Sequence, residues 1–327
     1  QNTIFGGLSK IQYYLKEIAL HKMKFALVTG GSGYLGSHVC KLLKRDGWNV
    51  VVYDIKQPNH NYHDLVIQKD VCDLYDLVDL MSDIKFDVVF HFAGRIEVGE
   101  SVENPTEFYR VNVGGTCNVL NAMANAGIKN IVYSSTAGVY SAKNELLKES
   151  DHTNWSNNPY AGSKLAAEQT IHHSGLNYII FRYFNLAGAS PDGDIGENHN
   201  PETHLIPRIL QNLNNFHIYG KDYSTPDGTC IRDYIHVDDV ANAHIKAAGR
   251  LLTGKQCHTI NLGTGKGYSV KEIVNLVEKI TGQRVKYEFM PRRDGDPDIL
   301  VADATIAKNI LYFQPKHDIC LLYTSDA

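Results

Sequence analysis

The sequence lacks the features that mark several classes of protein. No run approaches the roughly 18 uninterrupted apolar residues of a membrane-spanning helix, and low-complexity and heptad repeats are absent. Neither sign of charge dominates, because 32 basic residues stand against 36 acidic ones for a formal net charge of −4. We therefore expect no membrane partner and no nucleic-acid partner held by bulk charge.

The sequence has few cysteines, and their spacing indicates no pairs. The six cysteines form no CxxC pair and lie far apart, so they predict neither a disulfide framework nor a thiolate zinc site. Free thiols in a reducing cytoplasm are the expected state. None of the 15 histidines lies in an HExxH motif, and no metal site is predicted.

The length of 327 residues predicts about two domains. The two ends differ from the rest of the chain. We interpret residues 1–22, which precede Met23, as an extension that is non-native or disordered. The tail at 320–327 follows no recognisable pattern, which we interpret as a truncated C-terminus.

A glycine-rich turn follows the first apolar run. Residues 24–29 (KFALVT) predict a buried strand, and Gly30, Gly33 and Gly36 then space a GxxGxxG motif that opens an amphipathic helix. Glycines at these places let the backbone approach a pyrophosphate, which a helix N-terminus attracts. The arrangement predicts a dinucleotide site.

Asp54 supports the same interpretation. It ends the next apolar run, NVVVYD, 18 residues after Gly36. A carboxylate there accepts hydrogen bonds from ribose hydroxyls and repels a 2′-phosphate, so NAD is favoured over NADP.

Strands and helices continue to alternate along the chain. Further strands are expected at 86–92, 130–135 and 177–184, and helices at 71–82, 103–127 and 159–174. This order predicts an α/β fold with a Rossmann-type doubly wound parallel sheet, whose ligands bind at the carboxyl ends of the strands.

Three residues suggest a reaction. Tyr160 and Lys164 lie four apart on one predicted helix face, and Thr136 ends the preceding strand. A nearby ammonium favours a phenolate, so we expect Lys164 to lower the pKa of Tyr160 from about 10 towards neutrality. Such a phenolate can take a proton from a substrate hydroxyl while the carbon beneath loses hydride.

The motifs together resemble those of a known family. They are VTGGSGYLGSH at 28–38, HFAGRIEVGES at 91–101, SSTAGVY at 134–140, NPYAGSK at 158–164, RYFNLAGA at 182–189, DGTCIRDYIHVDD at 227–239, NLGTGKGYS at 261–269 and RRDGD at 292–296. The chain resembles the extended short-chain dehydrogenase/reductases, and within them the 4-epimerases of UDP-glucose and UDP-galactose. The resemblance implies tightly bound NAD, a UDP-hexose substrate, a 4-keto intermediate and a cytoplasmic homodimer.

The resemblance also implies a domain division and a cofactor site. The NAD domain would span 23–190 with returns near 231–242 and 258–264, and a smaller, discontinuous α/β substrate domain would span 191–319. The expected NAD contacts are Gly30, Gly33, Tyr34, Leu35, Gly36, Asp54, Ile55, Asp70, Val71, Phe92, Ala93, Gly94, Asn112, Ser134, Tyr160, Lys164 and Phe184.

The substrate site implied by the resemblance comes mainly from the second half. Its expected members are Thr136, Asn185, His204, Leu205, Ile218, Tyr219, Arg232, Arg293, Asp296 and Leu300. Arg232 and Arg293 would hold the phosphates, and Asp296 would hold ribose hydroxyls. Leu300 stands where a bulky Tyr narrows the sugar pocket in the family, so we expect UDP-N-acetylhexosamines to be accepted as well.

Some positions differ from the family pattern, and others narrow the choice among related enzyme classes. Related dehydratases need acidic residues directly after the strand-end threonine, where this chain has Ala137 and Gly138. Ile96 replaces a family lysine, with Arg95 beside it. A 4-epimerase of a UDP-pentose or UDP-uronate, an NAD-linked nucleotide-sugar dehydrogenase and a nucleotide-binding sensor without turnover remain open alternatives.

A second glycine-rich stretch has a different interpretation. Gly263–Gly267 precedes Ser269 and a helical pattern, which is typical of a turn leading into a helix cap rather than of another phosphate loop.

Overall fold

The computed structural model describes residues 23–143, 145–155, 158–197, 202, 204–293 and 296–319. The expectations for 1–22 and 320–327 lie outside these residues and stay predictions. In the part of the chain that is described, no helix is long and apolar enough to cross a membrane.

Seven parallel strands form the central sheet. In sheet order they are β10 (Cys257–Leu262), β6 (Asn177–Tyr183), β5 (Asn130–Thr136), β4 (Val88–His91), β1 (Phe25–Thr29), β2 (Asn49–Asp54) and β3 (Leu65–Gln68). From β1 the chain moves outward through β2 and β3, and then in the other direction through β4, β5 and β6. The order reverses between β1 and β4, where doubly wound sheets bind their ligands. The predicted Rossmann-type α/β fold is confirmed.

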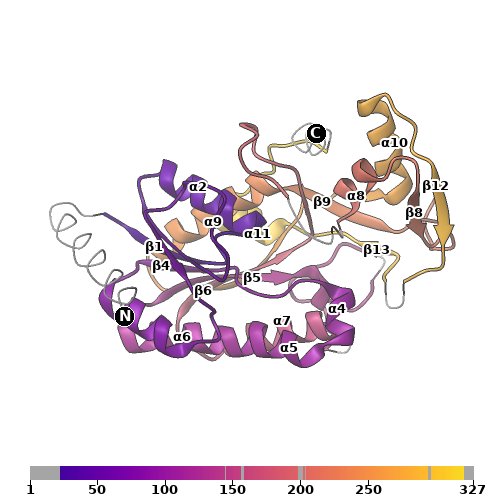
Figure 1. The fold of residues 1–327 in the computed structure, drawn as a ribbon. Helices are drawn as coiled ribbons and strands as arrows, with labels where there is room; N and C mark the ends of the chain where they lie inside the picture. Colours follow the sequence, from indigo (N-terminus) through magenta and orange to yellow (C-terminus); the bar gives the residue numbers. More distant parts are fainter. Residues whose placement is uncertain are drawn as a thin grey trace.

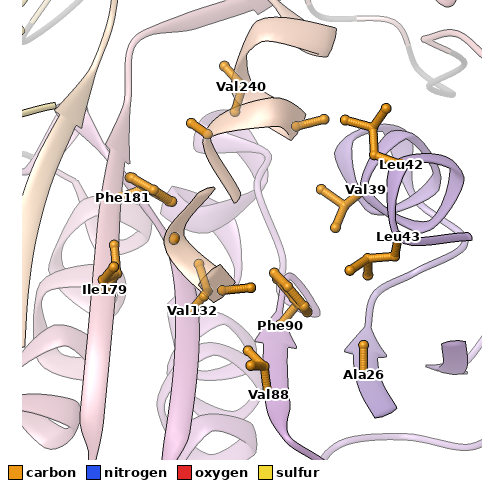
Figure 2. Close-up of a cluster of buried hydrophobic side chains, with 14 of the residues drawn as sticks. Ala26, Val39, Leu42, Leu43, Val88, Phe90, Val132, Ile179, Phe181 and Val240 are labelled. Carbon is orange, nitrogen blue, oxygen red and sulfur yellow. The ribbon is translucent and has the colours of Figure 1, made fainter. Parts of the chain in front are cut away.

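Helices cover both faces of this sheet (Figure 1). One layer holds α2 (Tyr34–Arg45), α9 (Val237–Leu251) and α11 (Thr305–Leu311); the other holds α3 (Leu74–Asp83), α6 (Thr116–Ala126) and α7 (Pro159–His172). Figure 2 shows part of the first layer's core, where Val39 and Leu43 of α2 gather beside Phe90 of β4. Both cores are built mainly from closely packed apolar side chains, so the sheet is a rigid platform for residues at its strand ends.

The helix predicted at 103–127 is broken into pieces. The structure has α4 (Val98–Glu103), α5 (Pro105–Tyr109), a π-helical turn over Arg110–Gly115, and then α6. Two contacts explain the wide turn. Asn112 holds the backbone of Arg95, and a Cβ on Gly115 would lie 2.8 Å from the Val71 side chain. A π turn inside a helix commonly marks a functional site.

The second half builds a smaller α/β unit. Strands β7 (Asn185–Ala187), β9 (Ile231–His236), β11 (Gly267–Ser269) and β13 (Ile299–Leu300) form one sheet, and β8 (Phe216–Tyr219) pairs with β12 (Tyr287–Met290). The helices α8 (Leu205–Gln211) and α10 (Val270–Thr281) pack on these strands at one end of the molecule (Figure 1).

The chain also returns to the first half from this unit. Strand β10 forms the edge of the main sheet beside β6, while α9 and α11 pack in the core of the first layer. The packing of α11 against the first half was not predicted from the sequence.

Candidate active site

The glycine turn between β1 and α2 has the close approaches that its residues suggest. Gly30 has a φ of +72°, and a Cβ there would lie 2.6 Å from the backbone nitrogen of Ala93. A Cβ on Gly36 would lie 2.2 Å from the carbonyl oxygen of Gly30. Only glycine fits at either place, and the result is an open backbone cradle at the start of α2.

Asp54 lies at the carboxyl end of β2 beside this cradle. One carboxylate oxygen accepts a hydrogen bond from the Ser32 backbone at 3.0 Å, and the other accepts one from the Lys56 backbone at 2.9 Å. These contacts fix the carboxylate at the edge of the turn, with lone pairs left for a hydroxyl donor.

A single cavity of about 940 Å³ lies along the carboxyl ends of the strands. Its volume is at the upper end of the range for small-molecule and cofactor sites. Predicted cofactor residues that line it are Gly30, Gly33, Tyr34, Leu35, Gly36, Asp54, Ile55, Asp70, Val71, Phe92, Ala93, Gly94, Ser134, Tyr160, Lys164 and Phe184. Predicted substrate residues that line it are Thr136, Asn185, His204 and Leu300.

Thr136 and Tyr160 meet inside this cavity. Thr136 ends β5, and its hydroxyl accepts a hydrogen bond from the Gly138 backbone at 3.0 Å. That contact leaves the hydroxyl proton free for Tyr160, and the Thr136 hydroxyl acts to lower the pKa of this phenol. Ala137 is buried in the short 3-10 turn that follows, so no acidic side chain stands beside the pair at this position.

The charge relation between Lys164 and Tyr160 differs from expectation. Burial raises the pKa of Tyr160 to about 12, with the carboxylate of Glu97 adding to the rise and Thr136 opposing it. The Lys164 ammonium donates instead to the carbonyl oxygen of Ser134 at 2.9 Å, and burial lowers its pKa to about 8. The prediction that Lys164 brings the phenol towards neutrality is therefore wrong for the protein by itself, because burial has the largest effect on the pKa of Tyr160 and Lys164 is not among the groups that shift it.

Asn112 was predicted to contact the cofactor, but its side chain is buried outside the cavity lining. Its amide holds both the N–H and the carbonyl of Arg95, at 2.8 and 3.1 Å, and donates to Ser163 at 2.9 Å. Asn112 thus links the π turn to the strand end after β4 and to α7, which carries Tyr160.

The loop around Ile96 presents charges that were not assigned from the sequence. Arg95 pairs with Glu100 and lies over the Phe108 ring, with its guanidinium carbon 5.7 Å from the ring centroid. Phe108 in turn meets the Tyr160 ring edge to face at 6.5 Å. Glu97 lines the cavity close enough to act on the Tyr160 charge.

The other predicted substrate residues lie outside the cavity lining, and four of them, Tyr219, Arg232, Arg293 and Asp296, make contacts within this set. Arg232 donates to Asp296 at 2.5 Å and lies beside Leu300 across the β9–β13 pair. Arg293 lies over the Tyr219 ring, 4.3 Å from its centroid. The Ile218 side chain is buried in the core of this half, and Leu205, the first residue of α8, is partly buried against the same core.

His204, directly before α8, does line the cavity and pairs with Glu197. Burial lowers the pKa of the imidazole, but the carboxylates of Glu197 and Glu202 outweigh it and raise the pKa to about 10. Sequence reasoning did not assign this pair, because Glu197 carries no motif signal. The imidazolium is a positive charge at the cavity wall.

A buried polar group below the reactive residues was also missed. Glu168 of α7 is fully buried and receives hydrogen bonds from Ser135 of β5 and from Arg182 of β6. The signal was present, since Glu168 follows Lys164 by four residues and Arg182 begins a motif already recognised.

Comparisons with known proteins place this geometry in context. Residues 26–263 match the NAD dependent epimerase/dehydratase family. The chain is 44% identical to a UDP-glucose 4-epimerase of Halalkalibacterium halodurans over 89% of its length and 90% of that protein. A crystal structure of UDP-glucose 4-epimerase from Brucella ovis with NAD superposes with a TM-score of 0.87 at 40% identity, covering 92% of this chain and 97% of that one. The structure from Bifidobacterium longum with NAD⁺ and UDP gives 0.84 at 33% identity, covering 93% and 97%.

Proposed function

This chain belongs to the NAD-dependent epimerase/dehydratase family, and from that membership we propose that it is a UDP-glucose 4-epimerase. It interconverts UDP-galactose and UDP-glucose through a 4-keto sugar. The observation that carries this conclusion is the convergence of Thr136, Tyr160 and Lys164 with the glycine cradle and Asp54 in one cavity. The curated relatives named UDP-glucose 4-epimerase support the same activity.

The cofactor is NAD, and the residues present fit it. Glycine at positions 30 and 36 allows the tight turn that brings backbone N–H groups to the cavity at the start of α2, where a pyrophosphate binds, and Asp54 lies where it can accept ribose hydroxyls. NAD, when bound, supplies reversible oxidation at the sugar C4. We propose that the sixteen predicted cofactor residues lining the cavity form its contacts, with Asn112 acting through Arg95.

The chain's own residues handle the proton. Tyr160 takes the proton of the sugar 4-hydroxyl as the carbonyl forms, and returns it after the keto sugar has presented its other face. Thr136 directs its hydroxyl proton to the phenol oxygen and so stabilises the phenolate. The Lys164 ammonium adds positive charge beneath the same site. Each cycle ends with the proton where it began.

We propose that the second half binds UDP. Arg232 of β9 pairs with Asp296, and Arg293 lies over the ring of Tyr219 of β8, whose neighbour Ile218 would offer its backbone. Planar guanidinium groups suit a diphosphate, and Asn185 and His204 continue the polar wall into the cavity. In this proposal the division at about 190, with its returns, separates cofactor binding from substrate binding.

The test is turnover of UDP-galactose by the purified chain with no NAD added, with Tyr160→Phe as the matched control. Formation of UDP-glucose by the parent and its loss in the variant would support both the reaction and a retained cofactor. Release of NADH in proportion to substrate would indicate a dehydrogenase instead. Failure of the parent even with NAD added would contradict the proposal.

We propose in addition that the pocket accepts UDP-N-acetylhexosamines. Leu300 lines the cavity and is half-buried, so its side chain leaves space where a tyrosine would project. UDP-N-acetylgalactosamine should then be epimerised by the parent and lost as a substrate in Leu300→Tyr, which should keep its activity on UDP-galactose. A parent that leaves the N-acetylated sugar unchanged at saturation would contradict this.

We propose that the enzyme is a homodimer. Val102 of α4 and Tyr109 of α5 expose 65% and 40% of their surface, and apolar exposure on neighbouring helices is typical of an interface. Analytical ultracentrifugation should give twice the chain mass, and Val102→Asp should shift it towards one chain. A monomeric parent would overturn this.

We also propose a cytoplasmic location. Its support is that the five cysteines in the described residues carry free thiols. Cell fractionation with a compartment marker tests it.

A further inference from the structure

Glu168 lies directly below the reactive residues and has no part in the mechanism above. Tyr160, Lys164 and Glu168 follow one another at four-residue spacing on α7, which places them along one side of the helix. The Glu168 side chain is 0% exposed. A carboxylate buried this completely needs strong compensation from its neighbours.

That compensation comes from both neighbouring strands. Arg182 donates two hydrogen bonds to Glu168, at 3.0 and 2.6 Å, and the Ser135 hydroxyl donates to the same carboxylate. Ser135 and Arg182 are direct partners in the β5–β6 register. One side chain therefore ties α7 to two strands, immediately before β5 ends at Thr136.

The buried positive charges around Glu168 outnumber the carboxylate that faces them. Lys164 and Arg182 are two buried cations, and Glu168 is the carboxylate that acts on both. The other groups facing Lys164 are the Tyr133 ring, at 5.1 Å from its centroid, and the neutral His91. Arg182 also faces the Tyr140 ring and Glu149.

We propose that Glu168 is a positioning residue for the epimerase reaction: it keeps Lys164 in its ammonium form and holds the Thr136 strand end against α7. This rests on the proposed function. The consequence for catalysis depends on how the protons are shared between Lys164 and Tyr160. The reactive form has one proton fewer than the fully protonated Lys164–Tyr160 pair, and within it the ammonium–phenolate arrangement competes with neutral amine and phenol.

Glu168 favours the ammonium in that competition. Burial lowers the pKa of Lys164 to about 8, and the Glu168 charge opposes this fall. With Glu168→Gln the pKa of Lys164 should fall further, by about one unit. The rise of kcat/KM with pH should then begin at lower pH, while its plateau drops about tenfold because less ammonium–phenolate is present.

The experiment separates charge from structure. Glu168→Gln leaves Arg182 as an uncompensated buried cation and lowers stability, so it is measured beside the double variant Glu168→Gln/Arg182→Met, which removes both charges. Glu149→Gln is the matched control, because it removes a carboxylate that faces Arg182 without acting on Lys164. All four proteins are assayed as isolated, with their bound cofactor, across pH 6–10.

A second readout is independent of turnover. Between the folded and unfolded pKa of Lys164 the folded protein holds fewer protons, so unfolding free energy rises with pH in that window. The rise should start at lower pH in both Glu168 variants and stay unchanged in Glu149→Gln. A double variant with parental stability, a parental pH–rate profile and a parental window would overturn the proposal. An inactive parent would count against the proposed function alone, because the unfolding window still decides this inference.

Discussion

The two halves of the molecule present their binding residues in opposite ways. In the first half, the cradle at Gly30 and Gly36 is made of backbone, and strand ends carry Asp54 and Thr136 directly into the cavity. In the second half, Arg232 and Asp296 are paired with each other outside the cavity lining. The first half therefore offers mainly backbone to a ligand, whereas the proposed UDP site of the second half offers side chains that also pair with each other.

This difference teaches where binding strength and selectivity come from. A preformed backbone cradle loses little conformational entropy on binding, which suits a cofactor retained through every cycle. Under the proposed function, ion pairs that exchange partners on binding offset part of the gain from substrate contacts, which suits a substrate that has to leave. Changes in the first half should therefore affect turnover and cofactor retention, whereas changes in the second half should affect the KM for the substrate.

The largest effect is expected where the halves meet. Tyr160→Phe removes the proton acceptor while keeping the ring that packs on Phe108. We expect kcat to fall by about 10²–10⁴-fold. The bound NAD of the purified variant, measured after heat release, should match the parent. Activity within tenfold of the parent would exclude Tyr160 as the acceptor.

The next largest effect tests the backbone cradle. Gly36→Ala places a Cβ 2.2 Å from the Gly30 carbonyl oxygen, so the turn must distort. We expect a loss of about 1–3 kcal/mol in unfolding free energy and of most of the bound NAD. Gly249→Ala, at an exposed helical position with nothing within 4 Å, is the matched control and should stabilise slightly. Equal behaviour of the two variants would mean that the cradle is not rigid.

A change in the second half should affect substrate affinity. Arg232→Met removes a guanidinium beside Leu300 and frees Asp296. We expect KM for UDP-galactose to rise about 10- to 100-fold, as for a lost charged hydrogen bond, with little change in kcat. Steady-state kinetics measure this split. A fall in kcat at constant KM would mean that Arg232 acts on the chemical step and not on substrate affinity. The proposed division of roles between the two halves would then be wrong.

The smallest effect is a pH dependence. Burial lowers the pKa of Lys164 to about 8 and raises the pKa of Tyr160 to about 12, so we expect the singly deprotonated pair to form as pH rises through about 8. We expect kcat/KM to rise roughly tenfold between pH 6.5 and a plateau, with the midpoint at or below about 8 because the cofactor's positive ring favours proton loss. A profile that falls over this range would contradict the assignment.

The same contrast explains how much could be predicted from the sequence. The fold, the glycine turn, Asp54 and the reactive trio follow from short-range spacing, and Ser269 caps α10 with Glu272 as its pattern indicates. The pKa of Tyr160 could not be predicted, because it depends on burial by elements distant in sequence. The π turn at Asn112 was missed for a similar reason, since its cause is a contact with Arg95, 17 residues away.

The returns of the chain to the first half have a consequence for its synthesis. Strand β6 is complete at Tyr183, but β10, which covers its edge, begins only at Cys257. A ribosome making the chain from its N-terminus therefore leaves a parallel strand edge open while more than seventy further residues emerge. Open edges invite pairing with other chains, so slow translation between β6 and β10 should favour aggregation of the nascent protein.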